Sequence, residues 1–361
     1  MSSGVDKSSG MMYAPKGKPK PVCGKGEFAV GVVGLEHGHI YGMCNGLVEA
    51  GAEVVLVYDP DPAKVAAFRK AFPEAQAARS MEEVLEHPRI NLIASAAIPA
   101  DRAGIGMQAL AHGKDYFADK PPFTTLAQID EARKKTVETG KRYAVYYSER
   151  LHVESAVFAG NLIAEGAIGR VVQVLGTGPH RISLSQRPEW FFQKEKYGGI
   201  LVDIGSHQIE QFLFFTGAKD AKVLSSRVAN FKFKQYPGLE DFGDATLLAD
   251  NGATGYFRVD WFTPDGLNSW GDGRTFILGT EGYIELRKYL DVGRSPEGDQ
   301  VFLVDHKGEH HYSVAGQVGF PFFGELIRDI LDGTRKAFDQ ELFFRATELA
   351  IIAELQALKI E

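Results

Sequence analysis

Cysteine is scarce in this chain, which has two cysteines, Cys23 and Cys44, among 361 residues. Two cysteines cannot form the disulfide framework of a small secreted domain, and a reducing compartment is the simplest interpretation. The chain also lacks the run of about 20 apolar residues that would span a membrane. Its first 26 residues, rich in Ser, Gly, Lys and Pro, contain no apolar core of a signal peptide. These absences lead us to expect a cytoplasmic protein.

Basic charge is not in excess either, because 40 Lys and Arg stand against 47 Asp and Glu, for a formal charge of −7. This balance argues against a general binder of nucleic-acid phosphates, and no basic helix-turn-helix segment stands out. Hydrophobic residues make up 44% and charged residues 24% of the chain, which is ordinary for globular proteins. At this length we expect two domains.

The first 27 residues are predicted to form a flexible N-terminal arm. The alternative is an arm that orders against a partner subunit or over a ligand.

Residues 28–148 alternate short apolar runs with amphipathic segments. Strands are predicted at 28–33, 53–58, 92–96, 115–118 and 142–147, and helices at 40–48, 63–72, 81–87, 103–112 and 126–138. This alternation indicates crossover units and therefore an α/β domain with a doubly wound parallel sheet.

Residues 149–361 change to an apolar and polar alternation with short turns. Strands are predicted at 171–175, 222–229, 245–249, 254–262, 283–286 and 301–304, and helices at 156–165, 204–215, 322–331 and 340–358. The pattern predicts an α+β domain with a large, mostly antiparallel open sheet. One face of this sheet is rich in aromatic residues and needs a cover, so we expect a homodimer or homotetramer that associates through it.

The turn after the first strand, Gly34-Leu-Glu36-His37-Gly38-His39, opens a helix and is suited to hold a pyrophosphate. Asp59 ends the second strand, where a carboxylate typically bonds the adenosine ribose and repels a 2′-phosphate. A turn residue before Pro60 is the plainer interpretation of Asp59. As a ribose-binding carboxylate, Asp59 predicts NAD as the cofactor, with NADP less favoured. Glu36 stands where the dinucleotide fingerprint has a glycine, and its carboxylate would repel the phosphates unless it points away.

Three passages together resemble the Gfo/Idh/MocA family of sugar and cyclitol oxidoreductases. They are the turn Gly34–His39, the tripeptide Asp119-Lys120-Pro121 after a strand, and Gly198-Gly-Ile-Leu-Val-Asp203-Ile-Gly-Ser-His207. The resemblance covers about Phe28 to the end and implies a Rossmann-like cofactor domain at 28–148 and a substrate-binding and oligomerisation domain at 149–361. It also implies catalytic roles for Lys120, Asp203 and His207. Asp119 replaces the usual Glu, and Tyr197 replaces a frequent glycine.

The chemistry of these three side chains suits oxidation of a carbinol. His207, with an ordinary pKa near neutrality, would accept the hydroxyl proton. Asp203 is four residues earlier on what reads as one helix and would orient the imidazole or the substrate. The Lys120 ammonium would stabilise the developing alkoxide. A surface pair or two metal ligands are the alternatives for Asp203 and His207, but no third ligand has an obvious spacing, and we expect no metal.

Candidate binding residues complete the site. Predicted cofactor contacts are Gly34, Glu36, His37, Gly38, His39, Asp59, Ala97, Pro99, Lys120 and Pro121; predicted substrate contacts are Arg150, Trp190, Tyr197 and His207. For any single aromatic residue, core packing is the commoner role, and for Arg150 the plainer interpretation is a salt bridge at a domain linker. His37 and His39 also allow a metal interpretation, but their place in the turn favours contact with cofactor or substrate.

The leading hypothesis is an NAD-dependent oxidoreductase that acts on a secondary hydroxyl of a sugar, glycoside or cyclitol. One alternative keeps NAD but returns the hydride, so that transient oxidation eliminates a glycosidic group. Another is a non-catalytic protein on the same scaffold that senses NAD or a sugar.

Overall fold

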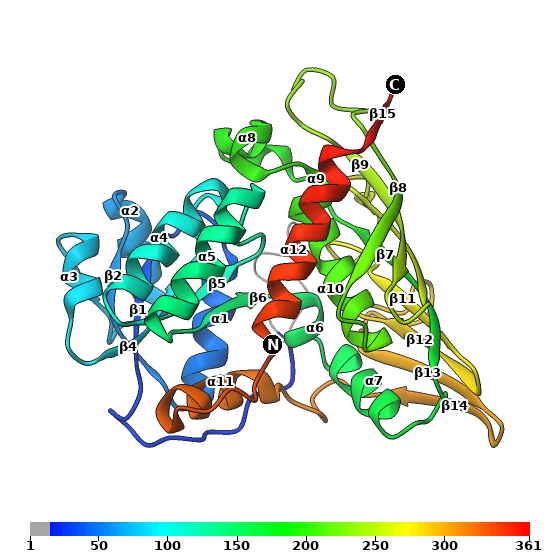
Figure 1. Ribbon diagram of the computed structural model, residues 1–361, viewed down its shortest axis with the longest axis horizontal. Helices are drawn as coiled ribbons and strands as arrows, with labels where there is room; N and C mark the ends of the chain where they lie inside the picture. Colours follow the sequence, from blue (N-terminus) through cyan, green and yellow to red (C-terminus); the bar gives the residue numbers. More distant parts are fainter. Residues whose placement is uncertain (1–14) are drawn as a thin grey trace. The chain divides into compact units, whose positions relative to one another are not determined.

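In the computed structural model, which describes residues 15–361, chain contacts divide the molecule into two units. The unit that we call the Rossmann unit comprises residues 18–146 and 319–343. The unit that we call the sheet unit comprises residues 15–17, 147–318 and 344–361 of the described chain. Figure 1 shows the elements of both units.

The Rossmann unit contains a six-stranded parallel sheet in the order β3-β2-β1-β4-β5-β6. Its strands are β1 (Ala29–Val33), β2 (Glu53–Tyr58), β3 (Gln76–Ala77), β4 (Ile90–Ser95), β5 (Asp115–Asp119) and β6 (Tyr143–Tyr146). β1, β5 and β6 are buried throughout, as expected for strands with helices on both faces. The strand order reverses between β1 and β4, which is where doubly wound sheets bind their ligands.

The helices of the Rossmann unit begin at recognisable signals. They are α1 (His39–Glu49), α2 (Pro62–Ala71), α3 (Met81–Glu86), α4 (Pro99–Ala111), α5 (Leu126–Thr139) and α11 (Pro321–Asp332). Thr125 and Gln128 form a reciprocal capping box at the start of α5, and the Asp61 and Ser80 side chains cap α2 and α3. α11 packs on α1 through Phe323: a Cβ added at Gly46 would lie 2.3 Å from its ring.

The sheet unit contains a nine-stranded mixed sheet in the order β14-β13-β12-β11-β7-β10-β9-β8-β15. Its strands are β7 (Val171–Pro179), β8 (Ala221–Ala229), β9 (Phe242–Ala249), β10 (Thr254–Asp260), β11 (Arg274–Gly279), β12 (Gly282–Arg287), β13 (Gln300–Asp305), β14 (Gly308–Ser313) and β15 (Leu358–Ile360). β7 pairs in parallel with β10, and β8 with β15, whereas the other neighbours are antiparallel.

Helices cover one face of this sheet. Its helical elements are α6 (Ser148–Leu151), α7 (Glu154–Ala164), α8 (Lys194–Tyr197), α9 (Ile200–Asp203), α10 (Gly205–Thr216) and the 3₁₀ turns at Leu184–Gln186 and Glu189–Phe192. α10 packs on β7, β9 and β10, and α7 packs on β12 and β13 (Figure 1). The last helix, α12 (Gln340–Leu355), contains the boundary between the units at 343/344.

The predicted fold class is confirmed: a doubly wound parallel sheet is followed by a large, mostly antiparallel one. The contact grouping differs from the expected 149–361 span, because residues 319–343 join the Rossmann unit and residues 15–17 and 147–148 join the sheet unit. Of the predicted arm, residues 1–14 lie outside the described residues, and in the rest the Val22 N–H donates to Ala50 O at 2.9 Å. Along residues 15–361, no helix is long and apolar enough to cross a membrane.

One predicted element is wrong. Asp203 and His207 do not share one helix, because α9 ends at Asp203 and α10 begins at Gly205. The backbone at the intervening Ile204 has φ −102° and ψ −40°, which departs from regular helix geometry.

Candidate active site

The turn after β1 is fastened to the ends of both neighbouring strands. The Gly34 N–H donates to Tyr58 O at 3.0 Å, and the Ala96 N–H donates to Gly34 O at 3.2 Å. Gly34 has φ +84°, and a Cβ on it would lie 2.7 Å from the Cβ of Ala97. Only glycine therefore fits both the backbone conformation and the space. The turn leads directly into the N terminus of α1, where backbone N–H groups favour an anion.

Asp59 holds this turn from the carboxyl end of β2. Its Oδ2 accepts the Leu35 N–H at 2.7 Å and its Oδ1 accepts the Asp61 N–H at 2.8 Å. The residue is only 5% exposed. The predicted ribose-binding carboxylate thus also has a structural role, because it fixes the turn in place.

Glu36 forms an ion pair with Lys64 of α2. The carboxylate at the fingerprint's glycine position is therefore compensated by a cation from the next helix. Since the two side chains are 21% and 33% exposed, the ammonium weakens the negative field of Glu36 at the turn without burying either charge.

Asp119, at the end of β5, is the most connected side chain of the Rossmann unit's candidate site. Its Oδ2 accepts Arg102 Nη2 at 3.0 Å, and its Oδ1 accepts the Lys120 N–H at 2.7 Å and His39 Nδ1 at 2.8 Å. Nδ1 of His37 lies 2.9 Å from Oδ2. Burial alone would raise the pKa of Asp119, but Arg102 and the two histidines outweigh it and hold the pKa well below its usual range.

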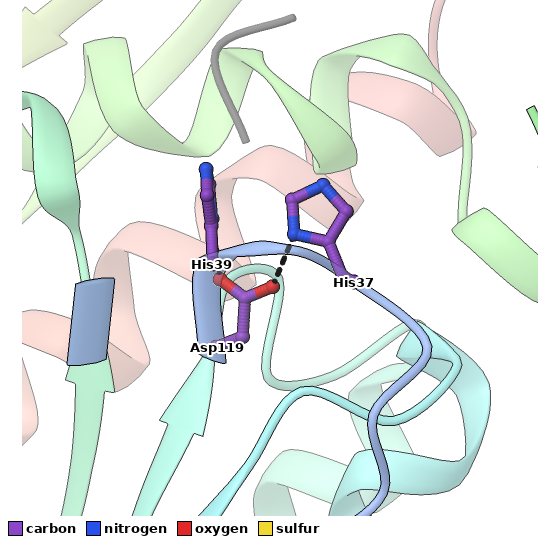
Figure 2. Close-up of side chains that lie close together, drawn as sticks. All are labelled: His37, His39 and Asp119. Atoms are coloured by element: carbon purple, nitrogen blue, oxygen red, sulfur yellow. Dashed lines mark hydrogen bonds and ion pairs between the residues drawn. The ribbon is translucent and has the colours of Figure 1, made fainter. Parts of the chain in front are cut away.

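The two histidines rise from the turn above this carboxylate, and their far ring nitrogens point away from it (Figure 2). Their rings meet edge to face with centroids 4.2 Å apart. Burial, with a smaller effect from His39, lowers the pKa of His37 to about 3, so its imidazole is neutral over the ordinary pH range.

Three of the remaining predicted cofactor residues are bonded to one buried guanidinium. Arg102 of α4, 1% exposed, donates to the carbonyl oxygens of Ala97, Lys120 and Pro121 as well as to Asp119. The Lys120–Pro121 peptide bond is cis. Pro99 is the first residue of α4. Lys120 itself is 5% exposed.

The other predicted site residues lie in the sheet unit. Gly198 and Gly199, with φ +92° and +99°, lead into α9. The Ile200 N–H donates to Glu240 at 3.0 Å and the Leu201 N–H donates to Glu354 at 3.1 Å, so two carboxylates cap the start of this short helix. This arrangement fixes the segment that ends at Asp203.

His207 lies in the first turn of α10 and is 2% exposed. Its ring meets Tyr147 edge to face at 5.8 Å, and the Tyr147 hydroxyl bonds Thr347 Oγ1 at 2.6 Å. Asp203 is half-buried.

A buried ion pair that sequence reasoning missed lies against the same helix. Glu149 Oε2 accepts Lys288 Nζ at 2.9 Å and Gln208 Nε2 at 3.0 Å, and Lys288 is 0% exposed. Burial raises the pKa of Glu149, but Lys288 and, to a lesser degree, His207 and His180 hold it below its usual range. No sequence signal marks this pair, because Lys288 lies 139 residues from Glu149.

The predicted substrate residues differ in how their polar atoms are used. The Arg150 guanidinium bonds Glu210 Oε1 at 2.5 Å and lies 3.9 Å above the Phe214 ring. A salt bridge is what the plainer interpretation of Arg150 predicted. The Tyr197 hydroxyl donates to Gly238 O at 3.2 Å and accepts the Glu240 N–H at 3.0 Å. Trp190 is half-buried.

An aromatic cluster in the sheet unit gathers around His180 and Trp261. The His180 ring lies 5.4 Å from Trp261 and 4.5 Å from Trp270. The Arg187 guanidinium lies 4.9 Å from the Trp261 ring centroid. Burial lowers the pKa of Arg187 to about 10, and the negative charge of the Asp203 carboxylate opposes this shift. Arg187 was not among the sequence candidates.

Comparison with known families gives two adjacent matches. The family model "Oxidoreductase family, NAD-binding Rossmann fold" matches residues 28–147, and the model "GFO/IDH/MocA C-terminal domain" matches residues 158–285.

Known proteins agree with these matches. A crystal structure from Erwinia carotovora atroseptica, described as that of an oxidoreductase, is 51% identical with a TM-score of 0.90 and covers 92% of this chain and 100% of its own. The scyllo-inositol 2-dehydrogenase (NAD⁺) of Bacillus subtilis is 26% identical over 65% of this chain and 66% of its own length. A levoglucosan dehydrogenase bound to NADH and levoglucosan shares the fold, with 18% identity, a TM-score of 0.74, and coverage of 91% and 98%. The chain spans between 38% and 66% of the length of the curated relatives that it matches.

Replacement of one partner of the buried Glu149–Lys288 pair tests its contribution. Glu149→Gln leaves a buried ammonium without its counter-charge, and we expect a loss of about 3–5 kcal/mol in the free energy of unfolding, measured in urea. The double variant Glu149→Gln with Lys288→Met removes both charges and should recover most of the lost free energy of unfolding. Because the pKa of Glu149 is depressed in the folded state, its stabilisation is complete above its ordinary pKa of 4.5 and is lost as the pH falls below that value. A Glu149→Gln variant as stable as the wild type would contradict this account.

Proposed function

Because the chain belongs to the Gfo/Idh/MocA family of oxidoreductases, we propose that it transfers a hydride between NAD and a secondary hydroxyl of a sugar, glycoside or cyclitol. The observation that carries the proposal is the Gly34–His39 turn, held by Asp59 at the point where the strand order reverses. Dinucleotides bind doubly wound sheets at this point. Relatives named as inositol, xylose and levoglucosan dehydrogenases support the substrate class.

The residues of the turn fit a dinucleotide. The backbone around Gly34 and Gly38 and the start of α1 would hold the pyrophosphate, and Asp59 would accept the ribose hydroxyls. Pairing with Lys64 removes the objection that Glu36 raised in the sequence. Bound NAD supplies the hydride acceptor for oxidation of the substrate. Asp59 favours NAD over NADP, because its carboxylate would repel a 2′-phosphate.

Three side chains would carry the proton and charge movements. The His207 imidazole would accept the hydroxyl proton. The Lys120 ammonium would stabilise the developing negative charge on that oxygen, which is worth most at a buried position. Asp203 would orient the substrate, and its negative charge acts on the nearby Arg187 guanidinium.

The sheet unit offers a suitable surface for a sugar. Trp190 and His180 are half-buried, and rings of this kind, with apolar faces and polar edges, suit the C–H and O–H groups of a carbohydrate. Arg150 and Tyr197, by contrast, have their polar atoms engaged with Glu210, Gly238 and Glu240, which supports a structural role beside any substrate contact.

Transient oxidation with return of the hydride remains an alternative mode of the same site. No residue distinguishes it from net oxidation, but the products do, because it releases a sugar without accumulation of reduced cofactor. The sensing alternative rested on Glu36, and the Lys64 ion pair weakens it.

We also propose that the protein is a cytoplasmic homodimer or homotetramer that associates through the open face of the sheet unit. On this face the large apolar side chains Leu175, Tyr256, Phe276, Leu278 and Tyr283 are 36–39% exposed. Leu175 is the cross-strand neighbour of both Tyr256 and Phe276, so these side chains form a continuous apolar stripe. A second copy of the chain is the simplest cover for such a stripe.

Turnover tests the proposed reaction. Incubation with NAD and a panel of sugars and cyclitols should produce reduced nicotinamide, which is measured by its absorbance. Lys120→Ala and His207→Ala should each lower the rate by about 10²–10⁴-fold. Unchanged turnover in both variants would exclude the assignment, and sugar release without reduced cofactor would favour the transient-oxidation alternative. The control variant is His310→Ala, which replaces a histidine of β14 outside the proposed site and should leave the rate unchanged.

The Glu36–Lys64 pair has its own test. Lys64→Met leaves the Glu36 carboxylate uncompensated at the turn, and we expect NAD to bind about three- to tenfold more weakly by calorimetry. Addition of Glu36→Gln to this variant should restore the affinity, because the repulsion is then gone. Equal NAD affinity of Lys64→Met and wild type would show that Glu36 does not act on the cofactor.

Association through the open sheet face is tested by one charge. Phe276→Glu places a carboxylate in the centre of the stripe and should shift the protein to monomers in light scattering. Val137→Glu, at an 85% exposed position of α5, should leave the mass unchanged. If Phe276→Glu keeps the wild-type mass, another surface holds the subunits together.

A further inference from the structure

We propose that His37, His39 and Asp119 form a binding site for a divalent transition metal ion, with Zn²⁺ as its best match. Each residue offers one ligand atom, and the three atoms lie within 4.8 Å of one another. Figure 2 shows the two imidazoles and the carboxylate converging at the end of β5. From the sequence, the place of His37 and His39 in the turn favoured contact with cofactor or substrate over a metal. The third ligand, Asp119, lies 80 residues from His39, so no local pattern joins it to the two histidines.

The feature that points to a ligand is Nδ1 of His37. This atom is buried and lies 2.9 Å from Asp119 Oδ2, but it makes no properly directed hydrogen bond to any of the residues that the structure describes. Nδ1 of His39, by contrast, is hydrogen bonded to Oδ1 at 2.8 Å. A buried polar atom without a directed partner is costly, and a metal ion shared with Asp119 would satisfy it.

All three ligands are held in place before any metal arrives. The His37 N–H donates to Ala96 O at 2.9 Å, and His39 is the first residue of α1. The Asp119 carboxylate is fixed by Arg102, which also bonds three backbone carbonyls. Metal-ligating carboxylates are typically hydrogen bonded in this way by an outer group.

The donor set selects the class of metal. Two imidazole nitrogens and one carboxylate oxygen suit Zn²⁺ or Co²⁺ rather than Ca²⁺ or Mg²⁺, which prefer oxygen alone. Three protein ligands leave at least one position for water or a substrate oxygen, as in catalytic zinc sites.

The surrounding charges set a limit on affinity. The Asp119 carboxylate is already paired with Arg102, and the positive charge of Lys120 contributes to the lowered pKa of His37, so it also acts at this site. A dication must therefore bind beside two cations, which weakens binding. This electrostatic cost gives the proposal an unusual signature, because removal of the Lys120 charge should strengthen metal binding.

This site goes beyond the proposed function, and its test does not depend on hydride transfer. The full-length protein, stripped with a chelator, is titrated with Zn²⁺ in competition with a chromogenic chelator, and Co²⁺ is used to record a visible ligand-field spectrum. We expect one ion per chain. His37→Ala and His39→Ala should each weaken Zn²⁺ binding at least tenfold and abolish the Co²⁺ spectrum, whereas Lys120→Met should tighten binding several-fold.

Controls separate this site from surface histidines and from misfolding. His310→Ala with His311→Ala removes two histidines of β14 and should leave binding unchanged. Asp119→Asn also disturbs Arg102, so the two histidine variants, which leave that ion pair in place, carry the comparison once circular dichroism shows them folded. Zn²⁺ affinity that is equal in the wild type and the His37→Ala and His39→Ala variants, or that is lost in the His310/His311 control, would overturn the proposal.

Discussion

The Asp119 carboxylate, buried at the end of β5, is the interaction on which the candidate site of the Rossmann unit depends. It binds Arg102 of α4, the backbone of Lys120 and the two histidines of the turn that begins after β1. Segments that lie far apart in the chain are thereby held together at the carboxyl ends of the strands. Together with Asp59, which holds the start of the turn, and Arg102, which bonds the Lys120 carbonyl, this side chain fixes the Lys120 backbone and the two histidines.

The same physical solution recurs in the sheet unit. Glu149 is buried against Lys288 beside α10, the helix that carries His207, and Glu210, a residue of α10, is buried against Arg150. Buried ion pairs add little net stability compared with apolar packing, but removal of one partner is costly. These pairs therefore act mainly on geometry, because they fix α10 and its neighbours in one arrangement. The consequence is that few single substitutions are tolerated there.

Local sequence patterns predicted most of the fold but not the contacts of the site. The strand 53–58 and the helix 81–87 agree with β2 and α3 to within a residue, because alternation, capping residues and turns are local signals. β11 was missed although it lies inside the sheet. The interruption between α9 and α10 at Ile204 was also missed, because no proline marks it in the sequence. The partners of Asp119, the Glu36–Lys64 pair and the grouping of residues 319–343 with the Rossmann unit join segments distant in sequence, and no local pattern encodes them.

The central claim is that the Gly34–His39 turn holds a nicotinamide dinucleotide, and a crystal structure of the protein with NAD tests it most directly. The account predicts density for the pyrophosphate against the backbone of this turn, ribose hydroxyls on Asp59, and a Glu36 carboxylate that remains on Lys64. A cofactor bound elsewhere, or Glu36 turned from Lys64 toward the phosphates, would contradict it.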